Sequence, residues 1–282
     1  PLEVLKDITY MDVSHTMVYD LSAMAQWKDL RTMIASHTLI QNLPTDVQHL
    51  RLEKLEVDHT SIDDNAVRRF LDKNPQCLVV YKSDQLKQWW TSISSEWKNV
   101  FNIQLGINEN PTEALHGLVE GEELHFQDTP VEELDVLREF IRLKRIHFSS
   151  TRISNLSPLS EHRNLISVHA TKSPVTNIEV VKELRLLEEL NISNTPIDNI
   201  DVLENLSTLK KLDCSGTPLR RLNALENLSS LLYLDCSNTL VRNLSPVVNI
   251  SLSVLKSYNT KISQRRIEEF QQVNPECEVT FY

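Results

Sequence analysis

Residues 187–219 read LEELNISNTPIDNIDVLENLSTLKKLDCSGTPL and contain two copies of one pattern. The first copy opens with apolar and polar residues in alternation from Leu190 to Ser193, which is typical of a β-strand. After Thr195, an apolar residue stands at every third position as far as Leu212. A period of three suits tight 3₁₀ turns or extended segments better than an amphipathic helix. Each copy therefore predicts a short strand followed by a compact return.

The pattern recurs along most of the chain with a nearly constant period. A Thr or Ser closes ten strand-like segments, which are 22 residues apart except for one interval of 69 and a last one of 21. The closing residues are Thr16, Thr38, Thr60, Thr129, Thr151, Ser173, Thr195, Thr217, Thr239 and Thr260. Repeats of this kind stack on their neighbours and build a solenoid.

The repeat resembles the leucine-rich repeat, whose pattern is L-x-x-L-x-L-x-x-[N/C]-x-L. The matching residues are Leu187, Leu190, Ile192, Thr195 and Ile197 in one copy, and Leu209, Leu212, Cys214, Thr217 and Leu219 in the next. The repeat length resembles that of bacterial internalins and of the leucine-rich regulatory subunit of protein phosphatase 1. The resemblance implies an α/β repeat solenoid, a right-handed superhelix with a concave parallel β-sheet, a convex side of 3₁₀ and irregular segments, and helical caps. It also implies a general role in binding proteins.

The closing position departs from the family, which usually has Asn where this chain has Thr. A Thr hydroxyl donates and accepts hydrogen bonds, so we expect it to satisfy backbone groups within the turn. The residue before it is His15, His37 or His59 in three copies. In other copies it is Asp128, Asn194, Gly216, Asn238 or Asn259. These residue types tolerate left-handed backbone angles, so we interpret this histidine row as turn geometry.

A duplicated segment accounts for much of the 69-residue interval. Residues 60–79 and 260–279 carry a Thr, a Phe, an Asn-Pro pair and a Cys in the same order, 200 residues apart. Each segment predicts a short helix behind an N-cap, Asp63 or Ser263, followed by a strand. Solenoid ends need caps because a terminal repeat otherwise exposes its core. We therefore expect residues 1–81 to be the C-terminal part of a first array with its end cap.

The second array is expected to span residues 82–282. It would consist of an N-terminal helical cap (82–122), repeats (123–260) and a C-terminal cap (261–282). Behind Ser83, an expected N-cap, apolar residues fall at helical spacing: Leu86, Trp89, Trp90, Ile93, Trp97, Val100 and Phe101. We interpret this tryptophan-rich stripe as the cap's own core contact, with partner docking as the alternative. Pro111 and Gly121 are expected to mark turns, and upstream repeats are expected to precede Pro1.

Composition excludes several function classes. The net charge of −10 argues against nucleic acid or an anionic membrane as the main partner. No apolar run approaches the ~20 residues of a membrane span. With only 4 glycines, the chain has no phosphate-binding G-x-G-x-x-G or G-x-x-x-x-G-K-[ST] motif, and it has no H-E-x-x-H or G-x-S-x-G motif. We expect neither enzymatic activity nor a cofactor.

The four cysteines form no C-x-x-C pair and no zinc-ligand spacing. Cys214 and Cys236 occupy inward strand positions, and Cys77 and Cys277 occupy equivalent cap positions. We expect all four to be small buried residues with free thiols. Free thiols favour a reducing compartment, whereas the likeness to internalins favours the cell surface, so the localisation stays open.

The concave face of the second array is the candidate binding surface for a protein partner. The residues expected to contact the partner are Glu123, His125, Arg145, His147, His169, Glu189, Asn191, Lys211, Asp213, Tyr233, Asp235, Lys256 and Tyr258. Among them Tyr233 and Tyr258, beside Asp213 and Asp235, form the best hot-spot candidate, because tyrosine anchors a partner at low entropic cost. The sequence thus predicts a non-enzymatic protein–protein interaction module whose partner and oligomeric state stay open.

Two alternatives rest on other features of the same surface. His125, His147 and His169 lie on three successive predicted strands, and neighbouring strands are ~4.8 Å apart. Such a row could share a Zn²⁺ or Ni²⁺ ion between two rings, or could become charged near pH 6. The first alternative is therefore a metal- or pH-responsive surface. The second is a structural spacer within a larger multidomain protein.

Overall fold

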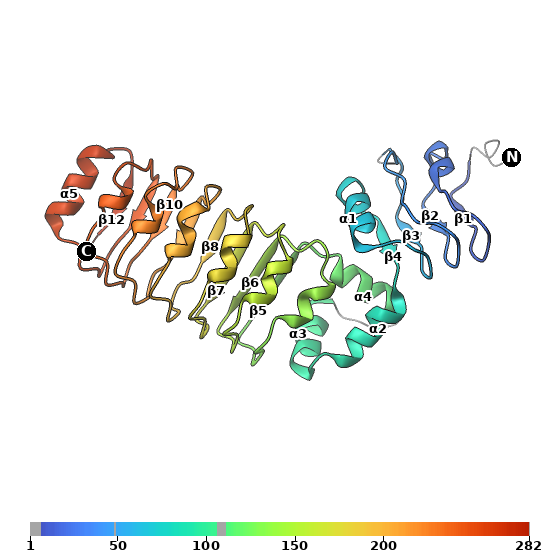
Figure 1. Ribbon diagram of the computed structural model, residues 1–282, viewed down its shortest axis with the longest axis horizontal. Coiled ribbons are helices and arrows are strands. Elements are labelled where there is room, and N and C mark those ends of the chain that lie inside the picture. The colour runs from blue at the N-terminus through green and yellow to red at the C-terminus, as the bar shows by residue number, and fades with distance from the viewer. Residues whose placement is uncertain (1–6, 48, 106–110, 282) are drawn as a thin grey trace. The chain divides into compact units, whose positions relative to one another are not determined.

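The computed structural model describes residues 7–47, 49–105 and 111–281. The chain folds into two compact units. Unit 1 comprises Pro1–Glu120 and Glu139–Ile141, and unit 2 comprises Gly121–Arg138 and Arg142–Tyr282. Each unit contains one parallel sheet, ordered β1-β2-β3-β4 in unit 1 and β12-β11-β10-β9-β8-β7-β6-β5 in unit 2 (Figure 1).

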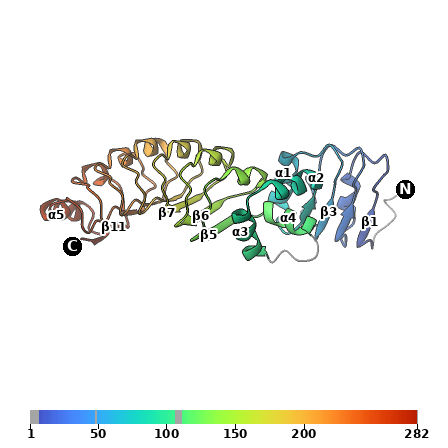
Figure 2. The ribbon, with the colours of Figure 1, turned by 90° about the horizontal axis from the view of Figure 1, so that it is seen from below.

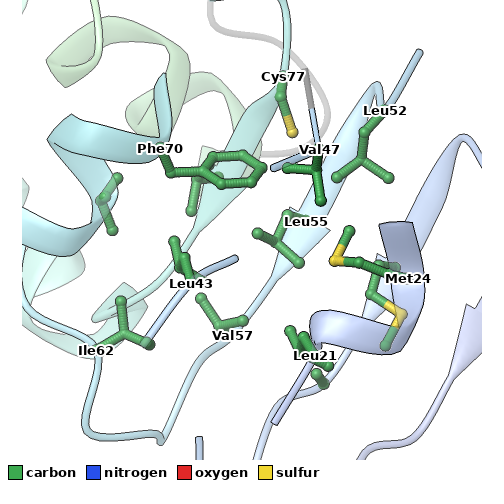
Figure 3. Close-up of a cluster of buried hydrophobic side chains, with 14 of the residues drawn as sticks. Leu21, Met24, Leu43, Val47, Leu52, Leu55, Val57, Ile62, Phe70 and Cys77 are labelled. Atoms are coloured by element: carbon green, nitrogen blue, oxygen red, sulfur yellow. The ribbon is translucent and has the colours of Figure 1, made fainter. Parts of the chain in front are cut away.

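Unit 1 combines a four-stranded sheet with four α-helices. Its elements are β1 (Tyr10–Asp12), η2 (Ser22–Gln26, a 3₁₀ helix), β2 (Thr32–Ile34), β3 (Lys54–Glu56), α1 (Asp64–Lys73), β4 (Leu78–Val80), α2 (Ser83–Ser92), α3 (Ser95–Leu105) and α4 (Pro111–Val119). Figure 3 shows its core, in which Met24 of η2, Leu55 of β3 and Phe70 of α1 pack together. All three side chains are buried. The core therefore lies between the sheet and the segments that return from it.

Unit 2 alternates strands with 3₁₀ helices before it ends in a helix and a strand. Its elements are β5 (Glu123–Gln127), η3 (Asp135–Glu139), β6 (Arg145–Ser149), η4 (Ser157–Glu161), β7 (Ser167–Thr171), η5 (Glu179–Glu183), β8 (Glu189–Asn191), η6 (Asp201–Asn205), β9 (Lys211–Asp213), η7 (Asn223–Leu225), β10 (Tyr233–Asp235), η8 (Ser245–Val247), β11 (Val254–Lys256), α5 (Gln264–Val273) and β12 (Glu278–Thr280). Figure 2 shows the 3₁₀ segments along one side of this sheet. The predicted alternation of strand and 3₁₀ return is confirmed.

Equivalent residues of successive repeats stack because the strands are parallel and in register. Leu190 of β8, for example, pairs with Val168 of β7 and Leu212 of β9. All three side chains are buried. Each repeat thus covers the apolar face of its neighbour, which is how a solenoid builds a continuous core.

Most closing positions make the turn hydrogen bond that the sequence predicts; Thr129 is an exception, because its hydroxyl is buried without a hydrogen-bond partner in the described residues. The Thr195 hydroxyl donates to the carbonyl oxygen of Ile192 at 2.6 Å. The residues whose hydroxyls make the equivalent bond to the carbonyl three positions earlier are Thr16, Thr38, Thr60, Ser173, Thr195, Thr217, Thr239 and Thr260. In several copies the same hydroxyl accepts from the amide two positions later, as Thr239 does from Val241 at 3.5 Å. The Thr side chain therefore does the work of the family's Asn.

The residue before each closing position adopts a left-handed backbone. His15, His37 and His59 have φ angles of 56°, 56° and 54°. Gly216, at the equivalent position, has a φ of 68°. The interpretation of His15, His37 and His59 as turn residues is confirmed. Because the repeats are in register, these three rings also stack, with centroids 4.4 and 4.1 Å apart.

Both predicted cap helices are present. The Asp63 carboxylate accepts from the amide of Ala66 at 2.8 Å and caps α1. Ser263 occupies the N-cap position of α5 with extended backbone angles, without a side-chain capping bond. Each helix ends at the Asn of the Asn-Pro pair, and β4 or β12 follows. The duplicated sequence thus forms a duplicated structure.

The segment after the first cap differs from the expectation in three respects. The apolar stripe forms two helices rather than one, because Ile93 takes an extended conformation between α2 and α3. Ser83 is not the N-cap; Lys82 is, with a φ of 50°. Pro111 begins α4 instead of marking a turn, a position that suits proline because its missing N–H would have no helical partner. Residues 106–110 lie outside the described residues.

Helix α4 packs against β4 within unit 1. At the end of this helix, the buried Glu120 carboxylate accepts from the amide of Val79 at 3.2 Å. Trp89 and Trp97 are buried, which confirms the interpretation of the stripe as a core contact at these two residues. Residues up to Glu120 belong to unit 1, and the role of 82–122 as opening cap of the second array stays a prediction.

The four cysteines are buried, and none forms a disulfide. Cys214 and Cys236 lie in the core beneath β9 and β10 with no exposed surface. Burial raises the pKa of the Cys236 thiol to about 12. The interpretation of these residues as small core side chains with free thiols is confirmed.

Candidate functional site

The open face of the second sheet is formed by the side chains of β5–β11 that point away from the core. In β5, Leu124 and Phe126 are buried, whereas Glu123, His125 and Gln127 are exposed. The same alternation continues along the sheet because a pleated strand turns successive side chains to opposite faces. The strand pairing then lines up equivalent outward residues of neighbouring repeats in rows.

The expected binding residues all occupy this open face, with different exposure. Exposed residues are Glu123, His125, Lys211 and Tyr258; half-buried ones are Arg145, His147, His169, Glu189, Asn191, Tyr233, Asp213 and Lys256; Asp235 is buried. The structure therefore brings the predicted set onto one surface. Their role in binding stays a prediction.

His125, His147 and His169, the histidine row, lie side by side as predicted. The rings of His147 and His169 are stacked, with centroids 3.8 Å apart and planes 4° from parallel. His125 stands edge-on to His147, with centroids 4.5 Å apart and an interplanar angle of 84°. Rows of imidazoles this close cannot all carry a positive charge without strong repulsion.

Burial lowers the pKa of both stacked rings, and the neighbouring rings add to the shift at His147. The pKa of His147 falls to about 4, mainly through burial and then through His169 and His125. The pKa of His169 is also lowered, again mainly by burial, although Glu189 opposes the shift. The prediction that the row becomes charged near pH 6 is therefore wrong for His147. At neutral pH, His147 is an uncharged hydrogen-bonding group.

A hydrogen-bond chain links His147 to Glu189 through a serine. The Nε2 atom of His147 lies 2.8 Å from the Ser167 hydroxyl, which donates to Glu189 at 3.5 Å. Ser167 is buried, and its hydroxyl lies between the ring and the carboxylate. This order of groups positions the histidine ring rather than activating a solvent-accessible serine.

Metal binding shared between the stacked rings of His147 and His169 has no geometric support. The lone pairs of an imidazole lie in the ring plane, so two nearly parallel rings direct their lone pairs along parallel lines. Zn²⁺ requires ligands that converge on one point. In the described part of the chain, no three or more His, Cys, Asp or Glu side chains are grouped so that they could hold a metal ion.

A hollow of about 550 Å³ lies over β5–β8 beside the histidine row. The residues that line it are His125, Phe126, Gln127, His147, Phe148, Ser149, His169, Thr171 and Asn191. The small side chains of Ser149 and Thr171 leave this space open. Gln127, Ser149 and Thr171 share the outward strand positions of the predicted binding residues, and the row of small Ser and Thr side chains predicts room for a partner near the sheet.

A second cluster lies further along the open face. Lys211 of β9 and Lys256 of β11 flank Tyr233 of β10, with ammonium groups 5.4 and 5.5 Å from the centre of its ring. This lysine–tyrosine cluster holds two flexible side chains against a rigid aromatic ring. Tyr233 also raises the pKa of Lys256 through a hydrogen bond. Tyr258, whose exposed fraction is 39%, follows at the end of β11.

The aspartates beside this cluster have a structural task that the hot-spot prediction did not include. The Asp213 carboxylate accepts from the backbone amide of Ser215 at 3.0 Å and from its hydroxyl at 2.7 Å. Asp235 accepts in the same way from the amide of Ser237 at 2.9 Å. These are Asx turns that close the strands, and the recurring Asp/Asn-x-Ser spacing was the signal for them. Changing Asp235 would therefore disturb the fold as well as the surface.

Unit 1 contains a buried polar chain that sequence reasoning missed. The Ser83 amide donates to Asp58 at 2.8 Å, its hydroxyl also donates to Asp58, and Nε2 of His116 lies 3.1 Å from that hydroxyl. Burial lowers the pKa of His116 to about 4, with Asp58 opposing the shift and Lys87 adding to it. These hydrogen bonds tie α2 and α4 to the turn after β3.

None of the helices in the described residues has the length and apolar character required to cross a membrane.

The comparison with solved structures supports the fold. No family model matches the chain, and no curated protein matches it. Among solved structures, an internalin from Listeria monocytogenes is 17% identical, with 97% of this chain and 82% of that chain covered and a TM-score of 0.54. A leucine-rich repeat protein from Leptospira interrogans is 14% identical over 99% and 86% of the two chains, with a TM-score of 0.46. The chain is thus similar to internalins in fold, and that fold is the leucine-rich repeat solenoid.

Proposed function

We propose that this leucine-rich repeat solenoid is a non-enzymatic protein-interaction module whose partner binds on the open face of the second sheet. Leucine-rich repeat solenoids present extended surfaces of this kind to proteins. The observation that carries the proposal is the hollow beside the histidine row, together with the lysine–tyrosine cluster on the same sheet. Both are built on strands, which hold side chains more rigidly than loops do.

The chemistry of the face suits a protein rather than a small reactant. Aromatic rings, amides, hydroxyls and charged groups alternate from β5 to β11, as they do at the polar interfaces that proteins form reversibly. The hollow is open on the sheet surface, whereas small-molecule sites enclose most of their ligand. Tyr233 and Tyr258 supply amphipathic rings with few rotatable bonds, which is the side-chain type enriched at binding hot spots.

The test is affinity capture with matched baits. One bait is the unaltered chain, and the second carries Tyr233→Ala and Tyr258→Ala, with Asp235 left in place because it closes a turn. A third carries Leu186→Ala, which removes an exposed apolar side chain (50% exposed) between η5 and β8. We expect a partner retained by the unaltered and Leu186→Ala baits and lost from the double variant.

Two outcomes would count against the proposal. Equal capture by all three baits, at equal melting temperature, would move the interaction away from these strands. Capture of no partner by any bait, in lysates that contain its natural partners, would favour the spacer alternative, in which no single open-face change alters an interaction.

A further inference from the structure

The hydrogen bonds of the histidine row define where its protons lie. Because the Ser167 hydroxyl donates its single proton to Glu189, it accepts from Nε2–H of His147. Nε2 of His169 lies 3.6 Å from the same Glu189 carboxylate, so that nitrogen also faces an acceptor. A neutral imidazole carries one proton. In both stacked rings the Nδ1 atom is therefore the one with a free lone pair.

Most of the charged groups around these rings have a partner within contact distance. Arg145 forms an ion pair with Glu123. Lys211 lies over the ring of Tyr233, and Asp213 closes its turn and accepts from Asn191. Glu189 accepts from Ser167 and lies 3.6 Å from His169; Lys211 stands opposite it in the strand pairing, but no lysine or arginine of the described chain forms an ion pair with it. Its carboxylate thus lacks a lysine or arginine ion-pair partner in the described residues and can accept further hydrogen bonds.

His147 and His169, which line the hollow, therefore offer acceptor nitrogens, and the Glu189 carboxylate lies next to His169. A guanidinium or ammonium group supplies the N–H donors and the positive charge that these groups lack. Arginine fits best because its five donors can reach a carboxylate and a ring nitrogen together. The net charge of −10 attracts cationic partners over longer distances and raises their association rate.

We propose that the hollow over β5–β8 receives a cationic side chain, an arginine or a lysine, from the protein partner. The proposal rests on the proposed function and adds the chemistry of the partner to it. Glu189 is the counter-ion, and the Nδ1 atoms of His147 and His169 accept hydrogen bonds. An acidic partner segment would instead require protonated rings, which their partial burial and mutual contact oppose.

The first test uses NMR of the full chain with ¹⁵N-labelled histidine. The probes are three capped tripeptides, Gly-Arg-Gly, Gly-Gln-Gly and Gly-Glu-Gly. At pH 7.5 the free protein should show protons on Nε2 of His147 and His169, and the arginine peptide alone should shift their Nδ1 resonances. By linkage, the arginine peptide should also lower the titration midpoints of both rings, since a bound cation disfavours a second positive charge.

A second test identifies the counter-ion with a matched pair of variants. Glu189→Gln should weaken the binding of the arginine peptide about fivefold. This loss of affinity corresponds to roughly 1 kcal/mol, at 1.4 kcal/mol per tenfold change. Glu179→Gln removes the same charge from η5, where Glu179 pairs with Lys182, and should leave the affinity unchanged. An equal loss of affinity in both variants would show that the arginine peptide responds to the net charge of the protein rather than to Glu189. This result would overturn the proposal.

Three further results would overturn it: protons on Nδ1 of both rings, no response to the arginine peptide up to its solubility limit, or midpoints raised by the glutamate peptide. None of these removes the proposed function if the Tyr233→Ala, Tyr258→Ala bait still loses its partner. Equal capture by that bait would remove the proposed function, and the tripeptide results would then describe a site without a protein partner.

Discussion

Acid should destabilise unit 1 through one buried histidine, His116. Its side chain is 1% exposed, and its Nδ1 atom has no hydrogen-bond partner in the described residues. Protonation would place a charge in this buried site, so the folded-state pKa lies near 4 instead of 6.5, although Asp58 opposes the shift. Between these two values the unfolded chain binds one more proton than the folded chain. The stabilising contribution is therefore complete above about pH 6.5 and is lost as the pH falls toward 4.

The size of the effect follows from the two pKa values. One proton of difference corresponds to about 1.4 kcal/mol per pH unit. Over the whole interval the loss is about 3 kcal/mol, of which about 2 kcal/mol falls between pH 7 and pH 5. Most small domains have only 5–15 kcal/mol of stability in total, so this change is large enough to measure.

Tryptophan fluorescence isolates unit 1 in this experiment, because all four tryptophans (27, 89, 90 and 97) belong to it. Urea unfolding followed by fluorescence at pH 7 and pH 5 gives the change in unfolding free energy. In the His116→Gln variant the amide can still donate to Ser83, but nothing titrates, so the change should shrink by about 2 kcal/mol. His49→Gln removes an exposed histidine and should keep the unaltered dependence. Equal pH dependence in the unaltered protein and in His116→Gln would refute the reasoning.

Three other predictions concern the repeats of unit 2. Thr195→Val should lower the free energy of unfolding by about 1–3 kcal/mol, because the carbonyl of Ile192 loses a buried donor, and Thr195→Ser should lower it less. Unfolding followed by circular dichroism would compare the two variants. A larger loss of stability in the Ser variant would contradict the argument. Gly216→Ala should lower the melting temperature, since a Cβ there would lie 2.5 Å from Oδ1 of Asn194 at a φ of 68°; an unchanged melting temperature would show that the turn adapts. Cys214 should resist thiol reagents until the protein unfolds, because burial raises its pKa and excludes the reagent, so rapid native-state labelling would count against the packing.

The repeats could be predicted from the sequence because each position of the repeat occurs many times along the chain. A Thr that recurs every 22 residues, with Asn, Asp, Gly or His before it, predicts both a turn hydrogen bond and a left-handed residue, and both are present. The same periodicity predicts that His125, His147 and His169 lie side by side, as they do. Periodicity therefore specifies which side chains share a surface.

Periodicity does not specify what a side chain does once it reaches the surface. The stacking of His147 on His169 and the Ser167–Glu189 chain depend on rotamers and burial, which set the proton positions. The segment 82–122 contains no repeat, so single residues decide its local backbone conformation. There Lys82, with left-handed backbone angles, occupies the N-cap position, while the Ser83 side chain bonds to Asp58 instead of capping.

The two caps show that a duplicated fold can carry different outward residues. In β4 the residues flanking Val79 are Leu78 and Val80, α4 packs against the strand, and Val80 is buried. In β12 the equivalent residues are Glu278 and Thr280, and both are exposed.

An apolar pair would be costly on a strand that faces water, and a charged residue would be costly beneath a packed helix. Charged residues on an exposed edge strand also discourage pairing with other strands. The substitution of Glu and Thr for Leu and Val thus matches each cap to its surroundings. The residues outside the shared cap pattern, rather than the pattern itself, distinguish a covered cap strand from an exposed one.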